Sequence, residues 1–238
     1  MNAKELYEDI RNFCRANINE ANIKKYSRYF KEGYDAYGLT QQLMHDKRDS
    51  LLSDNKVNMK TVLGASKSLI KSGKYEETGF AVILLKEFAE KFDKTTFTQI
   101  GLWFEIGISN WAHCDVICSY LIKIFFERKI ITYKALADWR KAKNKYQRRA
   151  VPVAMIEILK SADNFGPLYK FIDPLMMDPE RVVGQGLGWF LREARKIKPE
   201  ETETFLLKWK NDAQRVIFQY ATEKMTKEEK RRFRKEKK

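Results

Sequence analysis

Two side chains near the middle of the chain, Trp111 and Asp115, have the types and the spacing to act together on a developing positive charge. Residues four apart share one face of a helix, so the indole and the carboxylate are expected side by side. A carboxylate stabilises a cation electrostatically, and the face of an indole attracts one. The pair therefore indicates chemistry on a substrate that becomes cationic.

The chain around this pair is strongly basic. It has 238 residues, with 46 Lys and Arg against 32 Asp and Glu, which gives a net charge of +14. Such an excess predicts attraction to polyanions, with nucleic acid as the leading candidate. Phosphates repel a carboxylate, so Asp115 is expected to have a specific reason to lie on such a surface.

Apolar residues recur at three- and four-residue spacing over long segments, as they do in amphipathic helices. Strict alternation is scarce, and only five prolines and 11 glycines punctuate the chain. The sequence therefore predicts an all-α fold. The expected helical segments are Glu76–Phe92, Trp111–Arg128, Tyr146–Ser161, Arg181–Ile197 and Asp212–Met225.

The starts of these segments recur at a near-constant interval: the first four lie 35 residues apart, and the fifth follows 31 residues later. A period of this length, with two helices per unit, is typical of an α-solenoid. The absence of a TPR consensus favours HEAT-like repeats in a single domain over residues 1–225, with a concave DNA-binding face. Residues 226–238 are expected to form a basic extension, either a solvated helix end or a further contact with phosphates.

The repeat phase relates residues that lie far apart in the sequence. Counted from the start of each repeat, Trp111 has offset 0, Asp115 offset 4, Arg149 offset 3 and Trp189 offset 8. Offsets 0, 4 and 8 fall on one stripe of a helix, and offset 3 is adjacent to it. Stacked repeats would therefore line these four side chains along one wall, where they could cradle a DNA backbone.

Three short motifs occur in register with the repeats. They are residues 109–115 (SNWAHCD), 147–150 (QRRA) and 187–193 (LGWFLRE), and the segment from Tyr29 to Leu39 precedes them. In this order the chain, from about Tyr26 to Trp209, resembles the HEAT-like-repeat DNA alkylation-repair glycosylases of the AlkD type.

The resemblance implies a curved solenoid that holds duplex DNA and excises positively charged alkylated purines, such as 3-methyladenine and 7-methylguanine. It implies that Asp115 is the catalytic carboxylate, that Trp111 and Trp189 pack on the deoxyribose of the lesion, and that Arg149 holds a nearby phosphate. The family is understood to work from the sugar side, without drawing the base into a pocket. Further candidates for contacts with DNA are Arg148, Arg192, Tyr29 and Lys31.

The chemistry also follows from the charge of the lesion. An N-alkylated purine already carries a positive charge, so it leaves without help from a general acid. Breaking its bond to the sugar creates an oxocarbenium-like cation, which carboxylates stabilise in glycoside hydrolysis. Asp115 could stabilise this cation and orient the attacking water. No lysine nucleophile is required, so we expect a monofunctional glycosylase that needs no cofactor and leaves an abasic site.

Several assignments stay open at the level of sequence. Arg148 and Arg149 are adjacent and cannot both lie on the inner stripe; Arg149 is favoured as the phosphate ligand, with Arg148 as the alternative. The glycines at 184, 186 and 188 could serve close helix packing or leave room for DNA beside Trp189. Arg192 could support the site or pair with acidic neighbours. His113 has no evident catalytic partner and is expected to point away from the stripe.

The remaining features exclude other classes of protein. Cys14, Cys114 and Cys118 do not form a disulfide framework, which favours a reducing, cytoplasmic location, with nucleoid DNA if the source is bacterial. Cys114 and Cys118 are expected to be buried thiols rather than metal ligands, and no metal site is predicted. No secretory signal and no membrane span are predicted.

Three functions remain for a basic solenoid of this kind. The first is a monomeric glycosylase acting on duplex DNA that contains alkylated bases. The alternative is a HEAT-repeat protein that binds damaged or branched DNA without catalysis. A third is a protein-binding solenoid whose charge attracts an acidic partner; salt dependence separates it from the others, because phosphate contacts release counterions.

Overall fold

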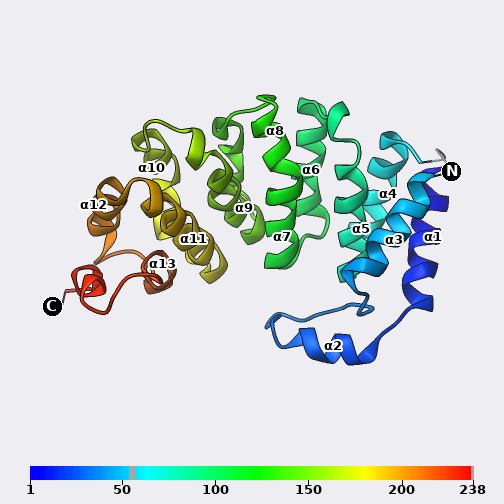
Figure 1. The fold of residues 1–238 in the computed structure, drawn as a ribbon, viewed down its shortest axis with the longest axis horizontal. Helices are drawn as coiled ribbons and strands as arrows, with labels where there is room; N and C mark the ends of the chain where they lie inside the picture. The colour runs from blue at the N-terminus through cyan, green and yellow to red at the C-terminus, as the bar shows by residue number, and fades with distance from the viewer. Residues whose placement is uncertain (54–56, 237–238) are drawn as a thin grey trace. The chain divides into compact units, whose positions relative to one another are not determined.

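The computed structural model describes residues 1–53 and 57–236, and within them it contains helices and turns but no strand (Figure 1). The prediction of an all-α fold is confirmed, and the packing of successive helices is consistent with an α-solenoid of helical repeats. No helix in the described ranges is long and apolar enough to cross a membrane. The α-helices are α1 Ala3–Ala16, α2 Glu20–Ser27, α3 Gln41–Ser53, α4 Met59–Lys71, α5 Tyr75–Lys86, α6 Lys94–Ile106, α7 Trp111–Ile117, α8 Lys123–Glu127, α9 Lys145–Met155, α10 Gly166–Ile172, α11 Arg181–Ile197, α12 Pro199–Trp209 and α13 Arg215–Ala221.

Single helical turns link or extend these helices. Most are 3₁₀ turns, and the one after α7 is a π-helical turn. They are η1 Ala89–Lys91, η2 Cys118–Ile122, η3 Tyr133–Leu136, η4 Asp138–Lys141, η5 Ile156–Ser161, η6 Asp173–Met177 and η7 Glu229–Phe233. Because η2 joins α7 directly to α8, the helical path runs without a break from Trp111 to Glu127.

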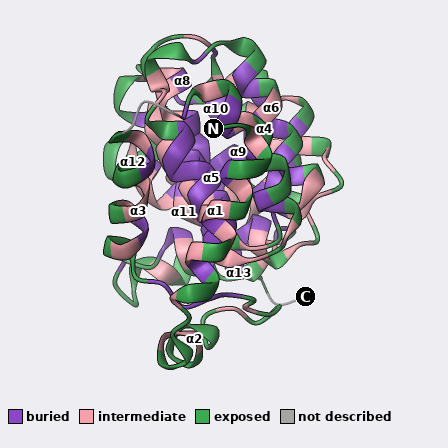
Figure 2. Cartoon of the chain, turned by 90° about the vertical axis from the view of Figure 1, so that its right-hand side faces the viewer, coloured by how far each residue is buried: buried purple, intermediate pink, exposed green. Residues whose placement is uncertain are grey.

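The chain divides into two compact units, Met1–Phe125 and Phe126–Lys238, and each is built around one central helix. In unit 1, α5 packs against α1, α3, α4 and α7 and is buried along most of its length (Figure 2). In unit 2, α11 packs against α9, α12 and α13. A helix that is apolar on nearly all sides, as α5 is, is stable only when neighbours cover it all round.

Asparagine or aspartate begins six of the helices. Each of these side chains accepts a hydrogen bond from a backbone N–H in the first turn, which would otherwise have no partner in the helix. The capping residues are Asn2 (α1), Asn19 (α2), Asn58 (α4), Asp93 (α6), Asn110 (α7) and Asn144 (α9). These caps fix where each helix begins, and therefore which residues lie in its first turn.

The predicted repeat starts agree closely with the structure. The helices α5, α7, α9 and α11 begin within one residue of the expected positions. The fifth, α13, begins at Arg215 rather than Asp212, because Asp212 belongs to the turn that follows α12. The helix-pair period therefore extends to the last repeat as well.

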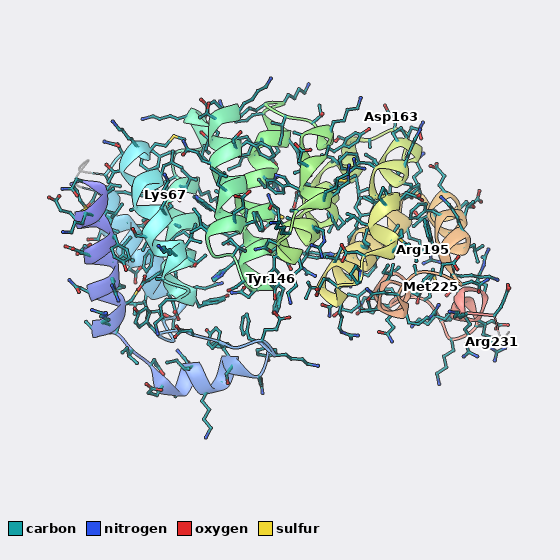
Figure 3. The ribbon with its side chains drawn as sticks, turned by 180° about the vertical axis from the view of Figure 1, so that it is seen from behind. Lys67, Tyr146, Asp163, Arg195, Met225 and Arg231 are labelled. Carbon is teal, nitrogen blue, oxygen red and sulfur yellow. The ribbon has the colours of Figure 1, made fainter. Side chains whose placement is uncertain are left out.

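The C-terminal segment is anchored to unit 2 rather than fully solvated. Phe233 is buried, and its carbonyl oxygen accepts a hydrogen bond of 3.0 Å from the Arg215 guanidinium. Arg232 forms an ion pair of 2.9 Å with Glu203 of α12. Figure 3 shows the side chains of this end of the chain, with Met225 and Arg231 labelled. The single domain over 1–225, with an extension after it, stays a prediction.

The glycines of α11 serve close helix packing. A Cβ at Gly188 would lie 2.5 Å from Tyr220 Cβ and 2.6 Å from the carbonyl oxygen of Ile217, both in α13. Gly186 faces α9 instead, where a Cβ would lie 3.2 Å from Arg149 Cγ. The packing alternative for this glycine run is therefore the one that the structure supports.

Gly188→Ala should destabilise the protein by about 1–3 kcal/mol, because the added methyl group overpacks the contact between α11 and α13. Gly166→Ala is the matched control, since its Cβ would meet only the end of the Asn164 side chain at 3.1 Å. Urea unfolding of both variants measures the difference. Equal stability of the two variants would contradict the close-packing assignment.

Candidate functional site

The start of α7 presents Trp111 and Asp115 in its first two turns. Asn110 caps the helix by accepting a hydrogen bond of 2.9 Å from the His113 N–H. Trp111 is 40% exposed, which is high for an indole, and Asp115 is half-buried. The predicted pair therefore lies at the beginning of a capped helix, with the aromatic face accessible from solvent.

A cluster of aromatic side chains packs against the Trp111 ring and holds it in place. Phe30 stacks on Trp111 with ring centroids 5.6 Å apart, and Tyr34 stacks on Phe30 at 4.6 Å. Tyr34 contacts Tyr75 at 5.2 Å, and Tyr75 stacks on His113 at 4.6 Å. The cluster therefore begins and ends on α7. Each aromatic pair stabilises the folded protein by roughly 0.5–1.5 kcal/mol beyond the burial of its surface.

His113 closes the cluster as a neutral imidazole. Its Nε2 lies 2.9 Å from the carbonyl oxygen of Tyr75, which can only accept, so Nε2 carries the proton. Its Nδ1 then accepts from the amide nitrogen of Asn110 at 2.8 Å. Burial lowers the pKa of His113 to about 4. The side chain is thus a structural tie between the starts of α5 and α7.

The buried carboxylate of Glu76 holds the segment that supplies Phe30 and Tyr34. This segment, residues 28–40, is called the arm here. Glu76 Oε1 accepts hydrogen bonds from the N–H groups of Gly38 and Leu39, at 2.7 and 3.1 Å, and Oε2 accepts from that of Tyr37 at 2.8 Å. Glu76 is 1% exposed, so its three bonds form away from water, where such bonds are strong.

Gly38 is required at the bend of the arm. Its φ of +80° lies in the left-handed region, and a Cβ would lie 2.3 Å from the carbonyl oxygen of Asn19. The Asn19 N–H in turn donates to the carbonyl oxygen of Tyr37 at 2.8 Å. The Asp35 carbonyl oxygen, two residues before Tyr37, accepts a hydrogen bond of 2.8 Å from the Tyr75 N–H, so the second half of the arm is fastened to the first turn of α5.

A groove of about 530 Å³ opens between the arm and α7. Trp111 lines it together with Tyr29, and the Trp111 Nε1–H donates to the carbonyl oxygen of Tyr29 at 3.4 Å. Tyr29 is 53% exposed, and the guanidinium of Arg28 lies 4.8 Å from the centre of its ring. Lys31 is exposed nearby in the sequence. Aromatic rings interleaved with basic groups suit contact with nucleic acid.

The predicted site residues divide between the two units. Unit 1 contains Tyr29, Lys31, Trp111 and Asp115, of which the structure brings Tyr29 and Trp111 into contact. Unit 2 contains Arg148, Arg149, Trp189 and Arg192. That all of these residues act on one lesion stays a prediction.

Arg148 is held by protein partners. Its guanidinium donates to both carboxylate oxygens of Asp178, at 2.6 and 3.3 Å, and to the carbonyl oxygens of Ala142 and Lys143 at 2.8 and 3.0 Å. Only 15% of the Arg148 side chain is exposed. Its role as a DNA ligand stays untested, and its geometry is that of a brace at the start of α9.

Arg149 and Trp189 lie along the same face of α11. The Arg149 guanidinium donates to the carbonyl oxygen of Val182 at 2.8 Å, and its side chain crosses α11 at Gly186. Positions 182, 186 and 189 share one face of a helix, which places Trp189, half-buried, one turn beyond Arg149. Arg149 is buried, so it ties α9 to α11 whatever its part in binding phosphate.

The surroundings of Arg192 and of the two neighbouring cysteines are also defined within each unit. Arg192 pairs with Glu193 at 3.1 Å and with Glu223, so it joins its acidic neighbours. Cys114 and Cys118 are buried, as predicted, and neither forms a disulfide. Across the described residues, no group of three or more His, Cys, Asp or Glu side chains could hold a metal ion.

Sequence reasoning missed Glu76 and the aromatic partners of Trp111. Two acidic residues in the first turn of an apolar helix normally signal an exposed, dipole-favoured helix start. Here Glu76 and Glu77 are both buried, and Glu77 Oε1 accepts from the Tyr37 hydroxyl at 2.7 Å. The one usable signal was the glycine at 38 in an aromatic segment, which indicates a bend that some other group must satisfy.

Glu76→Gln should destabilise the protein by about 1–3 kcal/mol and loosen the arm, because an amide NH₂ cannot accept the bonds that a carboxylate oxygen accepts. Glu77→Gln is the matched control, because Glu77 Oε2 has no hydrogen-bond partner in the described structure. Hydrogen exchange at the Gly38 and Leu39 amides reads out the arm directly. Unchanged exchange in Glu76→Gln would contradict the proposed clamp.

Acid should weaken the fold through His113. Its pKa falls from 6.5 in the unfolded chain to about 4 in the folded protein. Between these values the unfolded chain binds one more proton, so stability decreases as the pH falls, by about 1.4 kcal/mol per pH unit. His113→Gln keeps a donor for the Tyr75 carbonyl and should remove this slope. The test is the free energy of unfolding of both proteins, measured at about pH 7 and 5. If the variant keeps the same pH dependence, a group other than His113 takes up the proton on unfolding.

Comparisons with known proteins agree with this fold. The family described as DNA alkylation repair enzyme matches residues 10–225. Among solved structures, the chain is similar to a predicted DNA alkylation repair enzyme from Enterococcus faecalis, with a TM-score of 0.74 and 16% identity, over 89% of this chain and 98% of that one. That likeness establishes the fold alone, and no curated protein gives a significant match. Because the family match spans most of the chain, the protein belongs to the DNA alkylation repair enzyme family.

Proposed function

We propose that this protein is a monofunctional DNA glycosylase that removes positively charged N-alkylated purines, such as 3-methyladenine and 7-methylguanine, from duplex DNA. The observation that carries the proposal is the exposed Trp111, fixed by Phe30 and the Tyr29 carbonyl oxygen one turn before Asp115. A rigid, solvent-facing indole beside a carboxylate suits a cationic sugar. Membership of a DNA alkylation repair family supports DNA as the partner.

The reaction breaks the bond between C1′ of the deoxyribose and the purine nitrogen. Both bonding electrons leave with the base, which neutralises its positive charge, so no proton has to be supplied to the leaving group. The sugar becomes an oxocarbenium-like cation, and Asp115 stabilises it. Water then adds to C1′ and loses a proton, and the product is an abasic site. Asp115 would also orient this water.

The other residues of the proposal bind rather than react. Trp111 and Trp189 would pack on the deoxyribose, and Arg149 would contact a phosphate from its place across α11. Tyr29 and Lys31 would contact the backbone from the arm. In this proposal the protein acts as a monomer on alkylated duplex DNA in the cytoplasm or nucleoid, where the excess of Lys and Arg favours association with phosphates.

Asp115→Asn should lower excision of 7-methylguanine by about 100-fold or more, because the sugar cation loses its counter-charge. Binding to duplex DNA should be equal or tighter, since a charge that phosphates repel is removed. Asp163→Asn, an equal change of charge at an exposed residue of unit 2, is the matched control. The measurements are release of the free base and a binding isotherm for each protein.

Full excision by Asp115→Asn would remove Asp115 from the mechanism. No excision by the wild-type protein, with salt-sensitive DNA binding intact, would favour the non-catalytic DNA-binding solenoid.

A further inference from the structure

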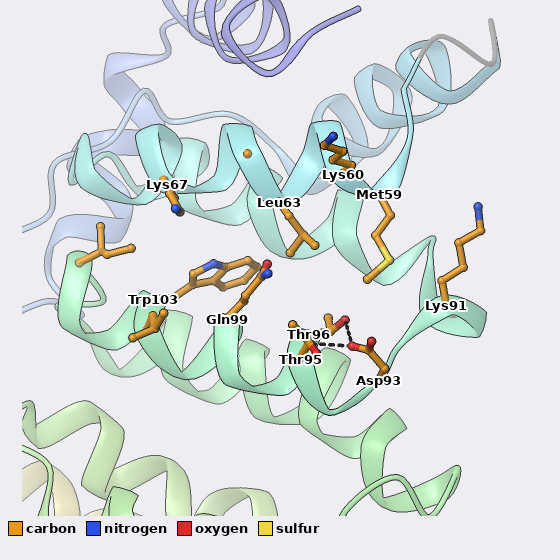
Figure 4. A pocket seen from close by; sticks show the side chains of 13 residues that line it. Met59, Lys60, Leu63, Lys67, Lys91, Asp93, Thr95, Thr96, Gln99 and Trp103 are labelled. Atoms are coloured by element: carbon orange, nitrogen blue, oxygen red, sulfur yellow. Dashed lines mark hydrogen bonds between the residues drawn. The ribbon is translucent and has the colours of Figure 1, made fainter.

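A second groove of unit 1 lies between α4 and α6, and the function proposed above does not use it. Its volume is about 720 Å³, and Figure 4 shows the side chains that line it. Each wall is a helix of 13 residues, roughly 20 Å long at 1.5 Å per residue. The lining residues recur at three- and four-residue spacing on both helices, so the groove is bounded by one continuous face of each.

The floor and one rim of this groove are apolar. Leu63 of α4 and Trp103 of α6 face each other across it (Figure 4). Leu102, on the α6 side, is 45% exposed. Leucine is among the residue types that are most often buried in folded proteins. Trp103 is 2% exposed, so it contributes a flat, buried base rather than a ring on which a nucleobase could stack.

The polar part of the lining includes three lysines. Lys60, Lys67 and Lys91 line the groove, with Lys67 toward one end and Lys91 toward the other in Figure 4. In the described part of the chain, no carboxylate lies within ion-pairing distance of these three ammonium groups. Asp93 is the one acidic residue in the lining, and its carboxylate caps α6 by accepting from the Thr96 N–H and hydroxyl at 2.7 and 2.8 Å.

We infer that this groove binds an acidic amphipathic helix of a partner protein. Apolar side chains of such a helix, spaced by three and four residues, would cover Leu63 and Leu102, and its carboxylates would meet the lysines at the rim. Within unit 1, α5 is likewise a helix that packs against two others, α4 and α7. The inference is independent of the glycosylase proposal, because no residue of the groove belongs to that site.

The chemistry of the groove favours this occupant over two others. A DNA backbone would bring hydrated phosphates against an apolar floor and would leave that floor in contact with water. A second copy of this chain carries a net charge of +14, which opposes association at a lysine-rich surface. An acidic amphipathic helix would cover the apolar floor with its apolar face and would pair its carboxylates with the lysines of the rim.

The probe is a fluorescent peptide of about 14 residues, enough for roughly 20 Å of helix, with leucines on one face and glutamates on the other. A second peptide of the same composition in scrambled order lacks the amphipathic face. Fluorescence anisotropy with the full-length protein gives the affinities. We expect the patterned peptide to bind at least about tenfold more tightly than the scrambled one, a difference of about 1.4 kcal/mol.

Two groove variants are compared with a control of equal charge change. Lys60→Glu/Lys67→Glu should weaken binding of the patterned peptide by about tenfold, and Leu102→Ala by several-fold, about 1 kcal/mol or less. The control, Lys160→Glu/Lys170→Glu, changes two exposed lysines of unit 2 and should leave the affinity within about twofold. Circular dichroism confirms that each variant is folded.

Three outcomes would overturn the inference. Equal weakening by the groove and control variants would mean general attraction between opposite charges. Loss of duplex DNA binding in Lys60→Glu/Lys67→Glu, with peptide affinity unchanged, would make the groove a DNA surface. Self-association in sedimentation experiments that Leu102→Ala abolishes would identify a second copy of the chain as the occupant.

Discussion

One buried carboxylate holds together the part of unit 1 that contains the candidate site. Glu76 lies in the first turn of α5, the central helix of the unit, and accepts three backbone N–H groups of the arm. Without these bonds, three buried donors of a sharp bend would have no partner, at a cost of roughly 1–3 kcal/mol each. Because the arm carries Phe30 and Tyr34, the same bonds determine where the aromatic cluster forms and how Trp111 is held.

The three arginines of unit 2 that were predicted to contact DNA are bonded to protein groups. Arg148 braces the start of α9 against Asp178, Arg149 ties α9 to α11, and Arg192 pairs with acids. The glycines of α11 let α9 and α13 approach closely. A rigid scaffold of this kind suits catalysis by pre-positioned charge, because the cost of orienting the groups is met during folding rather than in the reaction. The proposed chemistry requires such a pre-positioned carboxylate but no proton donor, because the lesion already carries the positive charge that makes its base a good leaving group.

The starts of the repeat helices α5, α7, α9 and α11 were predictable from the sequence, and the contacts that position the candidate site were not. The apolar period predicted Arg181–Ile197 for α11 and Trp111 as the start of α7, because both follow from the local pattern of the sequence, which at α7 includes the capping residue Asn110. Glu76 escaped prediction because its partners lie 37 to 39 residues away, beyond any local pattern. Phe30 and Tyr34 were indistinguishable from loop aromatics for the same reason. The burial of Arg149 likewise depends on α11, which approaches α9 only in the folded chain.

The central claim is that the lesion's own positive charge makes it a substrate for a site that contributes a carboxylate. The most direct measurement compares the release of 7-methylguanine, which is cationic in DNA, with the release of an uncharged base such as uracil from otherwise identical duplexes. The account predicts that the protein releases the cationic base and leaves the uncharged one in place. Comparable release of uracil would contradict it, because an uncharged base requires a proton donor that this mechanism does not include.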